Sequence, residues 1–145
     1  MLKDKIYIAS DHAGFDLKTQ ICTFLKDENL NFKDLGTNNK ESCDYPDFAH
    51  LLAKNIDETS FGIIICGSGI GVSIAANRHE NIRCALCSES LSARLARKHN
   101  DANVLALGGR LIGISLAIDI ITNFINTPFE NGRHIQRIQK IEVNK

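Results

Sequence analysis

Short runs of apolar residues alternate with longer amphipathic segments along the whole chain. The clearest run is Ile63, Ile64 and Ile65, which are β-branched and adjacent, as in a strand that is buried on both faces. Between such runs, apolar residues recur at helical spacing, for example at Leu17 and Ile21. The pattern predicts strands at residues 6–9, 32–35, 63–65, 82–87 and 104–107, and helices at residues 17–29, 46–56, 72–77, 88–99, 112–126 and 132–143.

This regular alternation of strands and helices determines the predicted fold class. The elements repeat roughly every 20–30 residues, which is typical of an α/β protein with a parallel sheet. We therefore predict a Rossmann-like three-layer sandwich in which helices cover both faces of a five-stranded parallel sheet. A chain of 145 residues suits a single domain, residues 1–145.

The segment after the central apolar run is rich in glycine. Cys66 ends the run, and a loop with three glycines leads into the next predicted helix. Glycine lets the backbone approach a ligand closely, and a helix start directs free N–H groups and the positive end of its dipole at that ligand. The segment therefore predicts an anion site beside a thiol, where the dipole favours the thiolate. The loop consists of Gly67, Ser68, Gly69, Ile70 and Gly71.

Two other interpretations of this loop remain open. It can be a tight turn without a ligand, with Cys66 as an ordinary buried cysteine. It can also bind a nucleotide, although Val72 stands where the third glycine of a dinucleotide fingerprint belongs, and no P-loop lysine follows. Glu89, about 20 residues further on, is at the distance of a ribose-binding acid, so a nucleotide-binding module is the alternative function.

Polar residues also follow the other predicted strands. In open parallel sheets the ligand site lies beyond the carboxyl ends of the strands. This rule adds to the Cys66 loop the residues Asp11 and His12 after the first strand, Ser88 and Glu89 after the fourth, and Gly109 and Arg110 after the fifth.

Three further side chains near the ends of predicted helices can take part in chemistry. Arg133 and Arg137 are four residues apart, so they share one helix face, where two like charges repel unless an anion lies between them. The pair is either a fork for a phosphate dianion or a solvated basic surface. His99 is either a helix C-cap or a group that titrates near neutral pH.

Charge and cysteine content narrow the possible functions. Lys plus Arg equals Asp plus Glu at 17 each, so no net charge attracts nucleic acid or a membrane surface. No apolar run approaches the ~20 residues of a membrane span. The N-terminus lacks the pattern of a signal peptide, and five cysteines in a chain of this size favour free thiols in the cytoplasm. Cys84 and Cys87 form a C-x-x-C, but residues three apart on a strand point to opposite faces, which argues against a redox or zinc pair.

Several short motifs occur together in an order that resembles a known enzyme family. They are Ser10-Asp11-His12-Ala13-Gly14, Asp44-Tyr45-Pro46, the loop Cys66 to Gly71 with Ile74-Ala75-Ala76-Asn77 after it, His99-Asn100-Asp101, and Gly132-Arg133-His134. Spread over nearly the whole chain, they resemble the sugar-phosphate isomerase family that includes ribose-5-phosphate isomerase B and the galactose-6-phosphate isomerase subunits. One branch of that family uses a glutamate just past the last loop glycine. This chain has Val72 there and resembles the cysteine branch.

The resemblance implies interconversion of D-ribose 5-phosphate and D-ribulose 5-phosphate in the non-oxidative pentose phosphate pathway, through an enediolate and without metal or cofactor. It also implies a homodimer with the site at the interface, which the last helix, about residues 132–143, helps to complete. A hexose-6-phosphate isomerase for allose or galactose 6-phosphate is the close alternative, and a paralogue that binds sugar phosphate without turnover is a third. The implied roles are Cys66 as base, His99 in ring opening, Asp11 and Asn100 on the sugar oxygens, the loop Gly67 to Gly71 as N–H donors to the enediolate, and His12, Arg110, Arg133 and Arg137 around the phosphate.

Overall fold

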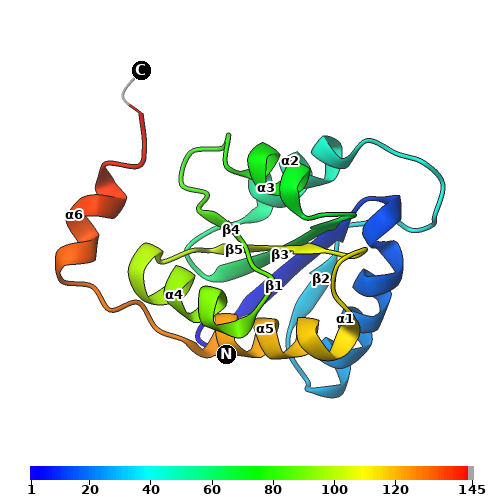
Figure 1. The fold of residues 1–145 in the computed structure, drawn as a ribbon, viewed down its shortest axis with the longest axis horizontal. Coiled ribbons are helices and arrows are strands. Elements are labelled where there is room, and N and C mark those ends of the chain that lie inside the picture. The colour runs from blue at the N-terminus through cyan, green and yellow to red at the C-terminus, as the bar shows by residue number, and fades with distance from the viewer. Residues whose placement is uncertain (144–145) are drawn as a thin grey trace.

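The computed structural model describes residues 1–143, which form a five-stranded parallel sheet between two layers of helices (Figure 1). The strand order is β2-β1-β3-β5-β4, and every neighbouring pair is parallel. The predicted Rossmann-like three-layer sandwich is therefore confirmed. The strands are β1 (Lys5–Ser10), β2 (Phe32–Asp34), β3 (Ser60–Cys66), β4 (Cys84–Leu86) and β5 (Val104–Gly108).

The central strand β3 explains the uninterrupted apolar run in the sequence. All seven of its residues are buried, and they alternate between two separate cores. Ile63 and Ile65 belong to one core, whereas Ile64 and Cys66 belong to the other. A strand that is covered on both faces has no solvent side, so its sequence shows no polar alternation.

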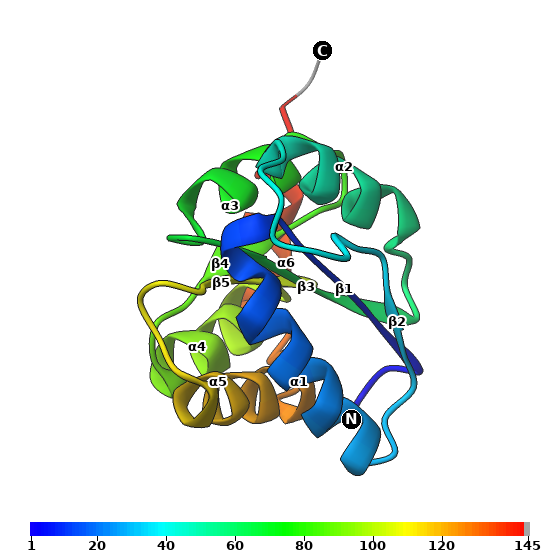
Figure 2. The same cartoon turned by 90° about the vertical axis from the view of Figure 1, so that its right-hand side faces the viewer.

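The helices divide between the two faces of the sheet. In the view of Figure 2, α1, α4 and α5 cover one face, and α2 and α3 cover the other. A short 3-10 turn, η1, joins β1 to α1, while α6 stands apart from the sheet beside α4 (Figure 1). The bounds are η1 (His12–Gly14), α1 (Phe15–Asp27), α2 (Tyr45–Asn55), α3 (Ile70–Ala76), α4 (Ser90–Asn100), α5 (Ile114–Asn126) and α6 (Arg133–Gln139).

Several predicted bounds were wrong. Strand β4 covers three residues instead of the predicted 82–87, because its ladder with β5 is limited to the pairs from Cys84 to Leu86. The last helix ends at Gln139 rather than at residue 143, and Lys140 and Ile141 close it with turn-like hydrogen bonds. Helix α3 begins two residues before the prediction, and α5 begins two residues after it. Among residues 1–143, no helix has both the length and the apolar content needed to cross a membrane.

Candidate active site

The carboxyl ends of three neighbouring strands meet at one edge of the sheet. Cys66, the last residue of β3, pairs in register with Gly108, the last residue of β5. Beyond the ladder, the Gly109 N–H donates to the Cys66 carbonyl at 2.8 Å, and the Asp11 N–H donates to the Ile65 carbonyl at 3.1 Å. These bonds hold the segments after β1, β3 and β5 against one another, as the strand-end rule predicts.

The Cys66 thiol lies under the glycine-rich loop. Its side chain is buried, and its Sγ atom accepts a hydrogen bond from the Gly69 N–H at 3.2 Å. Gly69 has a φ of +77°, and a Cβ atom there would lie 2.5 Å from a methyl of Leu86 and 2.8 Å from the backbone of Leu107. Only glycine therefore lets the loop turn close enough over the sheet edge to donate to the sulfur. An N–H donor in this position stabilises a sulfur atom that carries negative charge.

The loop also presents the start of α3 to the same edge. Ser68 Oγ accepts the Ile70 N–H at 3.2 Å, which begins the helix. The next N–H groups, from Gly71 and Val72, are in the first turn, where a helix offers no acceptor of its own. The ring of Tyr45 packs directly against this turn: a Cβ atom added to Gly71 would lie only 2.6 Å from the Tyr45 ring. The motif containing Tyr45 was visible in the sequence, but nothing in the sequence predicted this contact.

Asp11, His12 and Arg110 surround the loop. Asp11 is buried and caps η1 by accepting the Gly14 N–H at 3.0 Å. His12 Nδ1 accepts the Cys43 backbone N–H at 3.2 Å, so a neutral His12 carries its proton on Nε2, which is left free to donate. The Arg110 side chain lies beside the loop, with Nη1 3.2 Å from where a Cβ of Gly67 would be. No pattern in the sequence predicted that Cys43 would orient His12.

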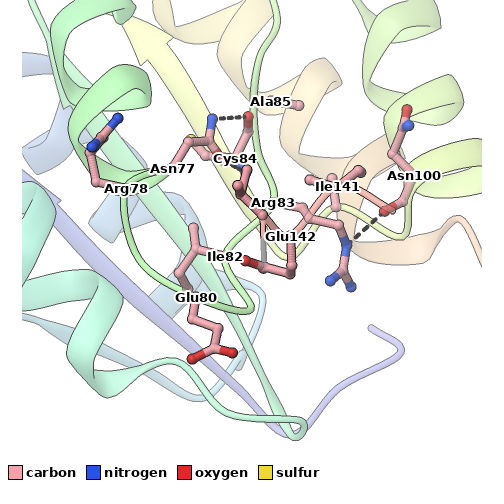
Figure 3. Close-up of a pocket in the computed structure, with 12 residues that line it drawn as sticks. Asn77, Arg78, Glu80, Ile82, Arg83, Cys84, Ala85, Asn100, Ile141 and Glu142 are labelled. Carbon is pink, nitrogen blue, oxygen red and sulfur yellow. Dashed lines mark hydrogen bonds between the residues drawn. The ribbon is translucent and has the colours of Figure 1, made fainter. Parts of the chain in front are cut away.

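Four other predicted site residues lie elsewhere in the same chain. Helix α4 starts after β4 at the carboxyl edge and runs back along the sheet, so its last residues, His99 and Asn100, lie at the amino edge. Arg83, just before β4, donates to the Asn100 carbonyl at 2.8 Å and confirms this location (Figure 3). Arg133 and Arg137 are both exposed on α6, which contacts α4. One chain thus brings Asp11, His12, the Cys66 loop and Arg110 together, but not His99, Asn100, Arg133 and Arg137.

His99 has two neighbours that received no role from the sequence. Its ring stacks on that of His134, with centroids 4.6 Å apart and an interplanar angle of 18°. The Nε2 atoms of both rings lie 3.8 Å from oxygens of the Glu130 carboxylate. Burial, followed by the neighbouring charges of His99 and Arg133, lowers the pKa of His134. Within residues 1–143, these three residues are the group whose side chains could together hold a metal ion.

The other sequence candidates have structural roles. Glu89 caps α4, where its carboxylate accepts the Ser92 N–H at 3.0 and 2.9 Å. Cys84 and Cys87 pack against opposite cores, as predicted, although Cys87 lies just beyond the end of β4. Burial raises the pKa of Cys87 to about 11 and raises that of Cys84 further. All five cysteines are free.

A sizeable cavity lies away from the thiol. It measures about 940 Å³ and lies between the β4 edge and the segment after α6, with Asn77, Arg83, Asn100 and Glu142 in its walls (Figure 3). Of the predicted site residues, Asn100 alone lines it. This cavity therefore does not coincide with the residues that the strand ends bring together.

Comparison with known proteins identifies similar chains along nearly the whole length. Residues 6–141 match the sequence profile of the Ribose/Galactose Isomerase family. Ribose-5-phosphate isomerase B of Escherichia coli K12 is 44% identical over 139 residues, which cover 94% of this chain and 93% of that protein. The crystal structure of a ribose 5-phosphate isomerase from Thermotoga maritima is 52% identical, with a TM-score of 0.93 and coverage of 94% and 96% of the two chains. Ribose-5-phosphate isomerase B of Mycoplasma genitalium, solved with bound ribulose-5-phosphate, is 44% identical with a TM-score of 0.91 and coverage of 94% and 93%.

Proposed function

The chain belongs to the ribose/galactose isomerase family, and from this premise we propose that it is an aldose–ketose isomerase that interconverts D-ribose 5-phosphate and D-ribulose 5-phosphate. The observation that best supports this function is the buried Cys66 thiol at the end of the central strand, which accepts a hydrogen bond from the glycine-rich loop. The ribulose-5-phosphate complex of the Mycoplasma relative supports the choice of substrate.

In the proposed reaction Cys66 is the base. From the open-chain aldose, its thiolate removes the proton on C2, the released electron pair forms the C1–C2 double bond, and the C1 oxygen takes the negative charge. The proton then returns at C1, and a second proton moves from the C2 oxygen to the C1 oxygen. Fixed N–H donors from the loop and the first turn of α3 stabilise the enediolate charge, and the loss of one such donor can cost ~10²–10³ in rate.

The remaining roles concern the two ends of the sugar. His99 opens the furanose ring by proton transfer, and Asp11 and Asn100 hold the sugar oxygens. The Nε2–H of His12 and the guanidinium of Arg110 bind the phosphate, together with Arg133 and Arg137. Holding the remote phosphate fixes C1 and C2 against the thiolate, so that binding energy lowers the barrier of the proton transfer.

We further propose that two chains build each site. His99, Asn100, Arg133 and Arg137 cannot reach the thiol of their own chain, but a symmetric partner can supply them. Large apolar side chains support an interface near the loop, since Ile70 and Ile74 on α3 and Leu91 on α4 are each more than half exposed, at 52%, 62% and 53%. A homodimer would cover them while completing the site.

Two other functions are weaker. A hexose-6-phosphate isomerase would need room for one more carbon, whereas the ribulose-5-phosphate complex of the Mycoplasma relative supports a pentose. A nucleotide-binding module would need the Glu89 carboxylate for a ribose, and that carboxylate already caps α4.

The decisive experiment measures turnover of ribose 5-phosphate and of allose 6-phosphate by the purified protein in the presence of a chelator. We expect activity with ribose 5-phosphate and much less with allose 6-phosphate. Cys66→Ala should abolish turnover while calorimetry still detects binding, and Cys87→Ala, at another buried cysteine, is the matched control that should stay active. Activity in the Cys66→Ala protein would exclude the thiol as base.

A further inference from the structure

His134 carries an unusual buried nitrogen atom. Its side chain is 8% exposed, and its Nε2 atom is one of two buried side-chain polar atoms without a hydrogen-bond partner among residues 1–143. A buried polar atom without a partner is costly, so an unpaired one calls for an explanation such as an absent ion. Nothing in the proposed isomerase chemistry uses this atom.

Two other potential ligands converge on the same point. The Nε2 atom of His99 and the carboxylate of Glu130 complete a group of three ligand atoms that all lie within 4.8 Å of one another. Each imidazole Nε2 is 3.8 Å from a carboxylate oxygen. That distance is too long for a hydrogen bond but close to the ~3.4 Å that separates neighbouring ligand atoms around a tetrahedral ion with bonds of about 2.1 Å.

The three side chains are held by different elements. His99 is in the last turn of α4, and His134 is in the first turn of α6. Glu130 lies in the connection between α5 and α6, where its backbone N–H donates to the Lys98 carbonyl at 3.0 Å. His134 is fixed by burial, whereas the side chains of His99 and Glu130 are 39% and 47% exposed and can close on an ion by roughly 1 Å.

We propose that His99, Glu130 and His134 form a binding site for a divalent transition-metal ion such as Zn²⁺, and that its occupancy inhibits the enzyme. Two imidazoles and one carboxylate are a donor set that suits Zn²⁺ and Co²⁺ rather than Mg²⁺. An ion bound to the His99 Nε2 atom removes the lone pair that ring opening requires. The binding claim stands on the geometry alone, and only the inhibition depends on the proposed isomerase function.

The surrounding charges limit the affinity. Arg133 and Arg137 extend from the same helix as His134 and oppose a cation, while the Glu130 carboxylate is the one anionic ligand. We therefore expect a site that fills at micromolar Zn²⁺ rather than one that retains its ion through purification. Such a site is reversible, which is what inhibition by an ion requires.

The test is a calorimetric titration of the chelator-treated, dialysed protein with ZnCl₂, and separately with CoCl₂, in a buffer without phosphate. We expect one ion per chain and a Co²⁺ spectrum without a thiolate-to-metal band. His134→Ala and Glu130→Gln should each weaken binding at least about tenfold. His79→Ala is the control, because it disrupts the other close histidine pair, His50 and His79, whose nitrogens are 2.7 Å apart, and it should leave the affinity unchanged.

Activity measurements then separate the two claims. Zn²⁺ should inhibit the turnover of ribose 5-phosphate, excess chelator should restore it, and Glu130→Gln should raise the inhibitory concentration. The site is refuted if no ion binds, if neither variant weakens binding, or if a thiolate band shows that cysteines such as Cys43 hold the ion. If the ion binds as expected but the chelated protein does not turn over ribose 5-phosphate, the metal site stands and the isomerase assignment fails.

Discussion

Two inactive variants are expected to regain activity when they share a dimer. The first carries Cys66→Ala and the second carries His99→Ala, so each lacks one group of the proposed reaction. Within one chain, Cys66 is at the carboxyl end of β3 and His99 at the far end of α4, a helix of 11 residues. Such a helix is ~16 Å long, whereas direct proton transfer needs contacts of about 3 Å. One chain therefore cannot supply both groups to the same sugar.

The expected recovery follows from the symmetry of a dimer. In a heterodimer of the two variants, one site combines the intact Cys66 of one chain with the intact His99 of the other, while the second site lacks both. A purified heterodimer should have about half of the wild-type activity, and a randomly exchanged equal mixture should have about one quarter. A heterodimer of wild type with the Cys66→Ala/His99→Ala double variant is the mirror control, because each of its sites lacks one group and it should be inactive.

The assay uses two affinity tags to isolate heterodimers after co-expression, and it follows ribulose 5-phosphate formed from ribose 5-phosphate. The assay starts from the aldose because its furanose ring must open before isomerisation, so that the loss of His99 lowers the measured rate. Each variant is carried through the same procedure alone to give the background. No gain over that background, together with half activity in the wild-type/double-variant heterodimer, would prove that both groups act within one chain and refute the shared site.

Three further predictions concern stability. Gly69→Ala should lower the free energy of unfolding by about 3 kcal/mol in urea titrations, because φ is +77° and the new Cβ would lie 2.5 Å from a leucine methyl. The control is Gly113→Ala, where a new Cβ would have no atom within 4 Å and the free energy of unfolding should change little. Equal losses in the two variants would contradict the steric argument. Asp34→Asn should lower the free energy of unfolding by about 3 kcal/mol, because it leaves the Lys18 ammonium, whose side chain is 2% exposed, without its counter-charge. Lys18→Met should lower it less, because the remaining Asp34 carboxylate is 37% exposed to water, and the reverse order would contradict this reasoning. Burial and the adjacent histidine of α2 lower the pKa of His79 from its usual value of 6.5, so the unfolded chain binds this proton more readily and the free energy of unfolding should decline as the pH falls through about 6.5. His79→Gln should flatten this slope, and an unchanged slope would assign it to other groups.

The sequence correctly predicted which short segments lie together at one edge of the sheet. The Ile63–Ile65 run identified a strand buried on both faces, and the strand-end rule then brought Asp11, the Cys66 loop and Arg110 to one edge. Helix ends were less accurate, as at α6, because a few competing hydrogen bonds decide where a helix stops. His134 belongs to a motif noted in the sequence, but its stacking on His99 was not predicted, and neither was the contact of Cys43 with His12, since both contacts join segments far apart in the chain.

The order of apolar and polar residues alone determined the class of fold and one half of the candidate site. Burial imposes a periodicity on each element, and parallel strands must end at a common edge, so both consequences can be read from a single chain. The tertiary structure alone decided that His99 and the α6 arginines lie away from the thiol, and that His99, Glu130 and His134 converge. Those relations depend on the direction in which helices run back along the sheet and on contacts between distant segments, which leave no periodic trace in the sequence.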